Sequence, residues 1–164
     1  MQRLRLFACL VLLPSFPAAA CICIVPRTPS EWYAVHRGQP TFVGLAISVE
    51  SRLDVVRMEG GKPLLDSSGK TRATTIQKVT FSVEESFEGV KTHEVEVYGF
   101  GTTCDYHFVA GQKYLVYGWL GLDGKIRTSI CTRTAPLSGA TDDRNFLRSL
   151  KSRGSLRKCQ NRPH

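Results

Sequence analysis

Apolar and polar residues alternate along much of the chain with the two-residue period of a β-strand. Residues 73–87 show this best, because Ile76, Val79, Phe81 and Val83 are separated mostly by polar neighbours. Successive side chains of a strand point to opposite faces of a sheet, so this pattern predicts a half-buried strand. On similar grounds we predict five strands, at residues 40–51, 73–87, 93–100, 112–120 and 124–132.

Helical spacing is confined to two segments that flank the predicted strands. Residues 30–37 begin with a capping serine and end before a glycine, which predicts a short helix. A second helix is expected at the end of residues 135–154. Asp142 and Asp143 suit its N-terminus, where the helix dipole favours negative charge.

Glycine-containing turns separate the strands. Residues 60–70 form a predicted exposed hairpin loop, Gly44 a predicted bulge, and residues 121–124 a turn that pairs the last two strands as a hairpin. The chain lacks the alternation of strands and helices that would indicate a parallel sheet. We therefore expect a mainly β fold, a five-stranded antiparallel closed barrel with short flanking helices.

The first twenty residues have the organisation of a secretory signal peptide. Arg3 and Arg5 are followed by an apolar run over residues 6–13 and by Ala18 to Ala20. The run is too short to span a bilayer. We expect cleavage after Ala20, and a protein that is secreted or periplasmic.

The remaining chain divides into one domain over residues 21–151 and a basic tail over residues 152–164. The net charge of +8 is unevenly distributed, since residues 21–143 hold thirteen basic and fourteen acidic side chains. Residues 144–164 hold seven basic side chains and no acidic one. We interpret these as a solvated helix face and terminus, with weak contact to a polyanion as the alternative. The near-neutral body argues against nucleic acid as a partner.

Export would place the cysteines in an oxidising compartment. Cys9 would leave with the leader, and five cysteines remain, at positions 21, 23, 104, 131 and 159. Residues two apart are poorly placed to bond each other, so Cys21 and Cys23 are expected to reach distant partners. Five is an odd number, and one thiol is left over.

No catalytic motif is present, and we expect neither an enzyme nor a bound cofactor. The stretch from Cys104 to His107 contains a cysteine near a histidine. In an exported chain a cysteine is more often half of a disulfide than a nucleophile or a metal ligand.

The new N-terminus offers a different chemistry. Cleavage after Ala20 would give Cys21 a free α-amine with an ordinary pKa of about 7.7–8.0. That amine and the Cys21 carbonyl oxygen can close a five-membered chelate ring on a metal ion. A catalytic zinc keeps one position for water, so this end would expel the water from a zinc protease. Disulfides at Cys21 and Cys23 would preorganise the segment, and Ile22 would point into the adjacent specificity pocket.

These features resemble the tissue inhibitors of metalloproteinases, and more broadly the netrin-like domains, in the small form found in bacteria. The resemblance runs through most of the mature chain. It is carried by Cys21-Ile22-Cys23 after the cleavage site, "PTFVGLAISV", "FSVEESFEGV", Cys104, "GQKYLVYG" and "SICTRTAPLS" with Cys131.

The resemblance implies an OB-fold barrel of five strands with disulfides Cys21–Cys104 and Cys23–Cys131. It also implies a protease-binding edge made of Cys21, Ile22, Cys23, Ile24, Val25, Pro26, Thr102 and Thr103, with the Cys21 amine and carbonyl on the partner's zinc. Two positions depart from the family. Ile22 replaces a small hydroxyl residue, and Cys159 lacks its usual partner near Trp32 or Tyr33.

Three other hypotheses remain open. Residues 18–21 loosely fit a lipoprotein signal, and lipidation of Cys21 would anchor the protein in the cell envelope and acylate the amine. It would leave four cysteines, an even set. A netrin-like binding or envelope module without inhibitory chemistry is the alternative function, and an oligonucleotide- or sugar-binding barrel is a third.

Overall fold

The computed structural model describes residues 21–23, 28–54, 58–59, 62–63, 65, 67–70 and 74–160. The predicted leader, residues 1–20, lies outside these ranges, as do residues 161–164 of the predicted tail. Side chains are described for most of these residues, but not beyond residue 153. Within this part the chain is mainly β with two α-helices, which confirms the predicted class.

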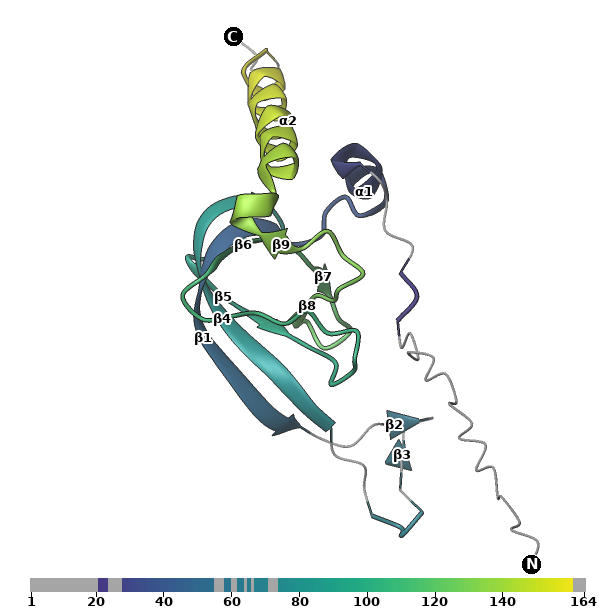
Figure 1. Ribbon diagram of the computed structural model, residues 1–164. Coiled ribbons are helices and arrows are strands. Elements are labelled where there is room, and N and C mark those ends of the chain that lie inside the picture. Colours follow the sequence, from purple (N-terminus) through teal and green to yellow (C-terminus); the bar gives the residue numbers. More distant parts are fainter. Residues whose placement is uncertain are drawn as a thin grey trace, which may run out of the picture.

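Seven of the strands form one mixed, curled sheet that makes a half-barrel (Figure 1). Their order across the sheet is β7-β8-β5-β4-β1-β6-β9. In chain order they are β1 (Thr41–Asp54), β4 (Thr74–Glu88), β5 (Glu94–Tyr98), β6 (Lys113–Tyr117), β7 (Trp119–Leu120), β8 (Ile126–Arg127) and β9 (Ala135–Pro136). The short hairpin of β2 (Met58–Glu59) and β3 (Lys62–Pro63) lies where the exposed loop 60–70 was predicted, and several residues of that loop lie outside the described ranges.

The longest strands form the centre of the sheet. β1 and β4 pair antiparallel over their whole lengths and extend together toward the β2–β3 hairpin (Figure 1). The register shifts between Val43 and Gly44, which confirms the predicted irregularity. A Cβ atom on Gly44 would approach the Ser82 carbonyl oxygen to 3.0 Å and the Phe42 ring to 3.2 Å. Glycine therefore lets the two strands stay close at the bend.

The prediction that all strands are antiparallel is wrong at one pair. β8 runs parallel to β5, with Val97 beside Ile126. Only β7 and β8 form the hairpin expected of residues 112–120 and 124–132. One side of β6 is occupied by β1 and the other by β9, so no edge of β6 remains for β8. The hairpin instead joins the free edge of β5.

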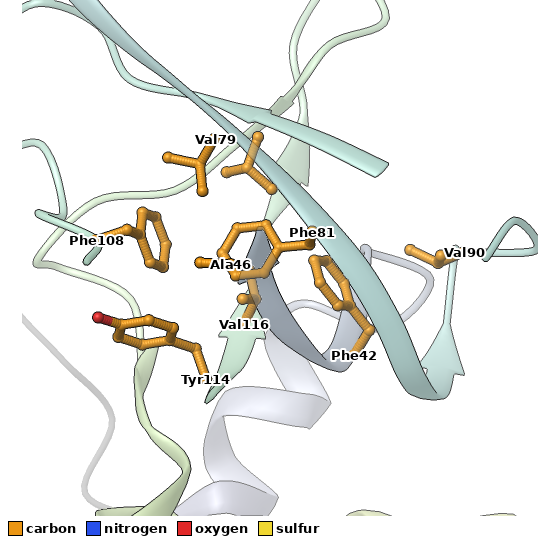
Figure 2. Packing of buried hydrophobic residues seen from close by; sticks show 9 residues of the cluster. Phe42, Ala46, Val79, Phe81, Val90, Phe108, Tyr114 and Val116 are labelled. Atoms are coloured by element: carbon orange, nitrogen blue, oxygen red, sulfur yellow. The ribbon is translucent and has the colours of Figure 1, made fainter. Parts of the chain in front are cut away.

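The concave side of the half-barrel holds the main hydrophobic core (Figure 2). Its buried members are Phe42, Ala46, Val79, Phe81, Val90, Val97, Phe108, Tyr114 and Val116. Phe81 packs edge-on against Phe42 and Phe108, at centroid distances of 5.5 Å and 5.1 Å. Each buried aromatic ring contributes roughly 1.5–3 kcal/mol through removal from water.

The convex side of β6 packs against both helices. Tyr114 and Val116 belong to the main core, whereas Leu115 and Tyr117 belong to a second cluster with Trp32. The strand is thus buried on both faces. A strand of this kind lacks the alternation of apolar and polar residues from which a half-buried strand is predicted. The two helices are α1 (Pro29–Val35) and α2 (Thr141–Gln160), the latter preceded by a 3₁₀ turn, η1 (Leu137–Gly139).

Both predicted helices are present with shifted bounds. α1 is capped by Thr28, whose side chain accepts from the Glu31 backbone while Glu31 accepts from the Thr28 backbone. Pro29 takes the first helical position, which favours this start over the serine that follows. α2 continues through Gln160, so the expected domain boundary at residues 151–152 falls inside a helix.

Helix α2 is fastened to the sheet by ion pairs and to α1 by an aromatic contact. Arg148 and Arg144 bind Glu85 of β4 at 2.8 Å and 3.2 Å. Tyr33 of α1 packs edge-on against Phe146 of α2. No helix in the described part of the chain has the length and apolar content that crossing a membrane requires.

Candidate functional site

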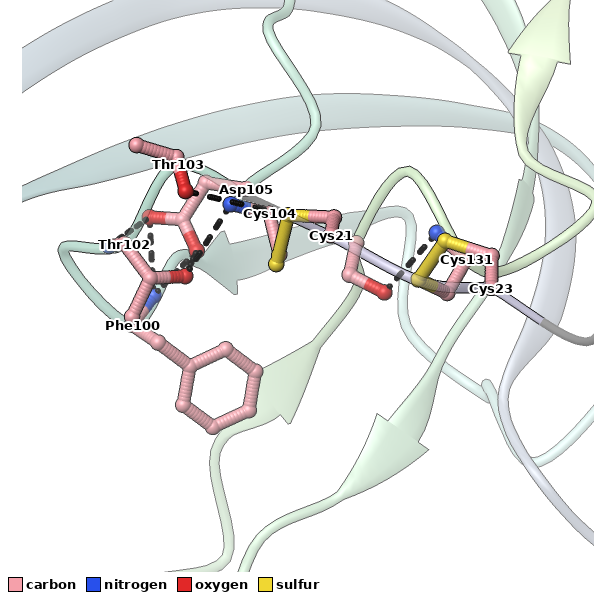
Figure 3. The surroundings of a disulfide bond; sticks show 9 residues. Cys21, Cys23, Phe100, Thr102, Thr103, Cys104, Asp105 and Cys131 are labelled. Atoms are coloured by element: carbon pink, nitrogen blue, oxygen red, sulfur yellow. Dashed lines mark hydrogen bonds between the residues drawn. A yellow bond between two sulfur atoms is a disulfide. The ribbon is translucent and has the colours of Figure 1, made fainter. Parts of the chain in front are cut away.

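Two disulfides fasten the N-terminal segment to loops of the β-domain (Figure 3). Cys21 is bonded to Cys104 and Cys23 to Cys131, with Cα–Cα separations of 5.7 Å and 5.0 Å. The two pairs that the resemblance implies are therefore present in the structure. The bonds bridge 83 and 108 sequence positions, so each closes a loop worth about 4–5 kcal/mol in the chain-entropy model.

Ile22, between the two anchored cysteines, has a 92 % exposed side chain. Its neighbours on both sides are covalently held, so its position is set by the two disulfides. A fully exposed isoleucine on a tethered segment buries almost nothing within its own chain. Its contribution to folding is correspondingly small, and its apolar surface is available to a partner.

The first of the two anchoring loops is organised by Asp105, a buried side chain. Its carboxylate accepts the backbone N–H of Phe100 at 2.9 Å (Figure 3) and that of Gly101 at 2.8 Å. The Thr102 hydroxyl donates to the same carboxylate at 3.3 Å. The loop that carries Cys104 is thus held together by hydrogen bonds to the carboxylate at its centre.

The structure brings one of the two predicted loop residues directly against the N-terminal segment. The Thr103 hydroxyl lies 3.7 Å from the Cys21 sulfur, and its side chain is exposed. Thr102 points instead toward Asp105 and accepts the Cys104 N–H at 3.3 Å. We define the N-terminal edge as Cys21, Ile22, Cys23, Thr102 and Thr103. The other predicted residues, Ile24, Val25 and Pro26, lie outside the described ranges.

The second anchoring loop, which carries Cys131, is joined to the first. Ile130 donates its backbone N–H to the Cys104 carbonyl at 2.9 Å. Cys131 donates its own N–H to the Ser129 hydroxyl at 3.2 Å. The Ile130 side chain is 44 % exposed next to the second disulfide. The two loops therefore position both cysteine partners as one unit.

A buried cluster of threonine hydroxyls holds the second loop on the sheet. The hydroxyl oxygens of Thr128, Thr132 and Thr134 lie 2.9 Å from one another, within hydrogen-bonding distance. Thr134 also accepts the backbone N–H of Tyr117 at 2.9 Å, and Thr128 donates to the Tyr117 carbonyl at 2.9 Å. The main chain at the end of β6 is satisfied by side chains here rather than by a neighbouring strand.

The same loop is connected to α2 through Asp143. Arg133 forms two hydrogen bonds to the Asp143 carboxylate, at 2.7 Å and 2.6 Å, and the Tyr117 hydroxyl donates to it at 2.9 Å. Burial, reinforced by the negative charge of Asp143, raises the pKa of Tyr117 well above its ordinary value. Asp143 raises the pKa of Arg133 as well. At physiological pH the tyrosine hydroxyl is therefore protonated and can donate to the Asp143 carboxylate.

A polar groove of about 430 Å³ lies beside Thr102 and Thr103. Ser51 of β1 and Gln77 of β4 line its far side, and His107 lines its end. Its described lining residues other than Gly101 carry polar side chains. The N-terminal edge consequently projects beside a concave, hydroxyl-rich surface, with Ile22 as its apolar member.

Sequence reasoning named Cys21, Ile22, Cys23, Thr102 and Thr103 but gave no role to Asp105 or Ile130. The signal for Asp105 was weak, namely an aspartate that follows a turn containing Gly99 and Gly101. Ile130 gave no signal, because an exposed isoleucine and a buried one look alike in sequence.

Cys104 is bonded to Cys21 and cannot act as a nucleophile in this form. His107 is exposed. Among the described residues, no three His, Cys, Asp or Glu side chains are grouped so that they could hold a metal ion. These residues form an anchoring loop.

Fold and site together define an extracytoplasmic class of protein, a β half-barrel with a disulfide-tethered N-terminal segment. The two disulfides indicate an oxidising compartment outside the cytoplasm. A scan against protein-family models and a search among curated proteins found no match to this chain.

Proposed function

We propose that the mature protein is an exported inhibitor of zinc metalloproteases. In this proposal the leader is cleaved after Ala20, and the new α-amine and carbonyl oxygen of Cys21 chelate the zinc of the protease. The zinc belongs to the partner, and the chain itself needs no cofactor. The chelate would take the coordination position that the protease's nucleophilic water needs.

The observation that carries the proposal is the exposure of Ile22 between two anchored cysteines. Folding alone gives no reason to hold a 92 % exposed isoleucine between two long-range disulfides. A protease cleft that takes the Cys21 terminus would remove the adjacent Ile22 side chain from water. Because the segment is already fixed, little conformational entropy is lost on binding.

The acid–base properties of an α-amine suit this role. Its ordinary pKa is about 7.7–8.0, so a substantial fraction is unprotonated at neutral pH and can donate its lone pair. Metal binding displaces the remaining proton, and affinity is therefore expected to rise with pH up to that range. A lysine amine, with an ordinary pKa of about 10.4, would be far less available.

The finer fold assignment belongs to the same proposal. We interpret the curled sheet as an OB-fold of the netrin-like kind, within which β1, β4, β5 and β6 with the β7–β8 hairpin take the place of a five-stranded barrel. Support comes from the curl of the sheet and from two disulfides that fasten the N-terminal segment to loops after β5 and β8.

The position of the Cys21 sulfur favours the free-amine hypothesis over the lipoprotein hypothesis. Lipidation consumes the Cys21 thiol, whereas here that sulfur is bonded to Cys104. A lipid-anchored binding module would have to release this bond and give Cys104 a different partner. The inhibitor uses the amine and the carbonyl and keeps the disulfide.

The test compares two forms that differ only at the N-terminus. One begins at Cys21 and the other carries a single extra Ala before it, and intact mass verifies both ends. Inhibition of collagenase-type and thermolysin-type zinc proteases is measured with fluorogenic peptides, and a trypsin-type serine protease serves as control. We expect the form beginning at Cys21 to inhibit at least one zinc protease and the extended form to be weaker by about 100-fold or more, equivalent to roughly 2.7 kcal/mol.

Equal inhibition by both forms would reject the chelation mechanism. No inhibition of any zinc protease would reject the function. A mass that shows an acylated Cys21 on protein exported with its own leader would favour the lipid-anchored binding module.

A further inference from the structure

A single buried carboxylate organises the loop on which the N-terminal edge rests. Asp105 is 6 % exposed. Three successive backbone N–H groups, those of Phe100, Gly101 and Thr102, converge on it at 2.9 Å, 2.8 Å and 3.4 Å. Consecutive N–H groups that point to one spot form an anion-binding concavity. Here the anion is supplied by the chain itself (Figure 3).

The backbone opposite Asp105 is shaped to admit the carboxylate. A Cβ atom on Gly99 would lie 2.4 Å from Oδ2 of Asp105 and 2.9 Å from its Cγ. Those distances are far below van der Waals contact, so any larger residue at position 99 would push the carboxylate out. The lack of a side chain at Gly99 and the carboxylate at Asp105 therefore act as a matched pair.

The loop transmits this order to the N-terminal segment through covalent and hydrogen bonds. Asp105 directly follows Cys104, and its own N–H is bonded to the Thr102 carbonyl at 3.2 Å. Cys104 holds Cys21 through the disulfide and receives the Ile130 N–H on its carbonyl. The carboxylate thus fixes Thr103 and the anchor of Cys21 in the same turn.

We propose that Asp105 is a positioning residue for the N-terminal edge. Its carboxylate, admitted by Gly99, holds residues 100–104 in the conformation that orients Thr103 and the Cys21 terminus for binding. This inference adds a residue role to the proposed binding site and rests on the proposed inhibitory function. Without the carboxylate the loop samples other conformations, and a partner must select the binding-competent one at a cost in affinity.

The variants Asp105→Ala, Asp105→Asn and Gly99→Ala test the inference against Leu147→Ala. Leu147 is a buried residue of α2 in the second cluster, remote in the fold from the edge, and its truncation destabilises without touching the loop. Inhibition constants are measured well below each thermal midpoint. We expect Asp105→Ala and Gly99→Ala to weaken inhibition about tenfold or more. Asp105→Asn should be intermediate, and Leu147→Ala should match the wild type despite its lower midpoint.

A double variant and an added anion separate positioning from general loss of structure. In Asp105→Ala the clash at position 99 disappears, so adding Gly99→Ala should cost little more. Formate or acetate can occupy the vacated concavity and should partly restore inhibition by Asp105→Ala but not by Gly99→Ala. Three results would each overturn the inference. They are an equal loss of inhibition in Asp105→Ala and Leu147→Ala, wild-type inhibition by Asp105→Ala, and additive losses in the double variant without rescue by the added anion.

A readout without protease keeps the two proposals separable. Hydrogen exchange at the Ile130 amide and at the residue 105 amide, which donate to the Cys104 and Thr102 carbonyls, should be about tenfold faster in Asp105→Ala, with Val79 in the core unchanged. If the wild type inhibits no zinc protease, the function fails while this measurement still decides the role of Asp105. Unchanged exchange at both of these loop amides would overturn that role even if the wild type is an inhibitor.

Discussion

The backbone N–H of Ile130 donates to the carbonyl of Cys104 at 2.9 Å. This bond joins the two loops that hold the disulfide partners of Cys21 and Cys23. The N-terminal segment is consequently bonded at two points to a pair of loops that are hydrogen bonded to each other.

Loss of either disulfide should weaken the fold but not abolish it. For the paired variants Cys21→Ser/Cys104→Ser and Cys23→Ser/Cys131→Ser, we expect the free energy of unfolding to fall by about 2–4 kcal/mol each, because the remaining disulfide still closes most of the loop and the unfolded chain regains only part of its entropy. Guanidinium unfolding measures the loss. The two losses should not add, since both bonds close nearly the same loop. A loss below 0.5 kcal/mol in both pairs would contradict the tethering described here.

Substitution of Ile22 should separate binding from stability. Ile22→Asp changes an exposed side chain, so the free energy of unfolding should change by no more than roughly ±0.5 kcal/mol, as for ordinary surface variants. Zinc protease inhibition should fall by about 30-fold or more, as for an apolar interface anchor, equivalent to roughly 2 kcal/mol. Leu122→Asp is the matched control, because Leu122 is also fully exposed but lies in the β7–β8 turn. If both variants inhibit like the wild type, Ile22 makes no contact with the partner.

The threonine cluster should be sensitive to the loss of one hydroxyl. Thr134→Val keeps the size and branching of the side chain but leaves the buried Tyr117 N–H without its acceptor. We expect a loss of about 1–3 kcal/mol in urea unfolding. Thr134→Ser retains the hydroxyl and should cost less than 1 kcal/mol, roughly the removal of one methyl group. Equal losses for both variants would point to packing instead of hydrogen bonding.

The attachment of α2 should weaken in acid. The hydrogen bond from Arg148, assisted by Arg144, lowers the pKa of Glu85. Because the folded-state pKa lies below the unfolded one, the carboxylate contributes stability that is fully present above the ordinary value of about 4.3. That contribution is lost as the pH falls through the lowered folded-state pKa.

Urea unfolding of Glu85→Gln and the wild type between pH 7 and pH 3 measures this contribution. The variant should be less stable by about 1 kcal/mol at pH 7, in the range of partly exposed ion pairs. The gap should shrink progressively below about pH 4. A gap that stays constant across this range would assign the effect to packing rather than to charge.

Much of the fold was predictable from local pattern. Strand alternation located β1, β4 and β5 to within a few residues, Gly44 marked the bulge, and the two acidic residues marked the start of α2. Pairing was less predictable, as β8 shows. Its two residues form the expected antiparallel hairpin with β7, but on their other side they lie parallel to β5. The choice depended on which sheet edge was free, and β6 was occupied on both sides.

The candidate site divides in the same way. The leader-like N-terminus and the Cys-Ile-Cys spacing are properties of adjacent residues, and the sequence by itself determined them. The tertiary structure alone decided that Ile22 is exposed, that Asp105 is buried among the N–H groups of its own loop, and that Ile130 connects the two anchoring loops. The reason is physical. Alternation and capping depend on neighbours in the chain. Burial depends on which surfaces the folded sheet leaves open, and so does disulfide pairing between cysteines that are separated by 83 or 108 positions in the sequence.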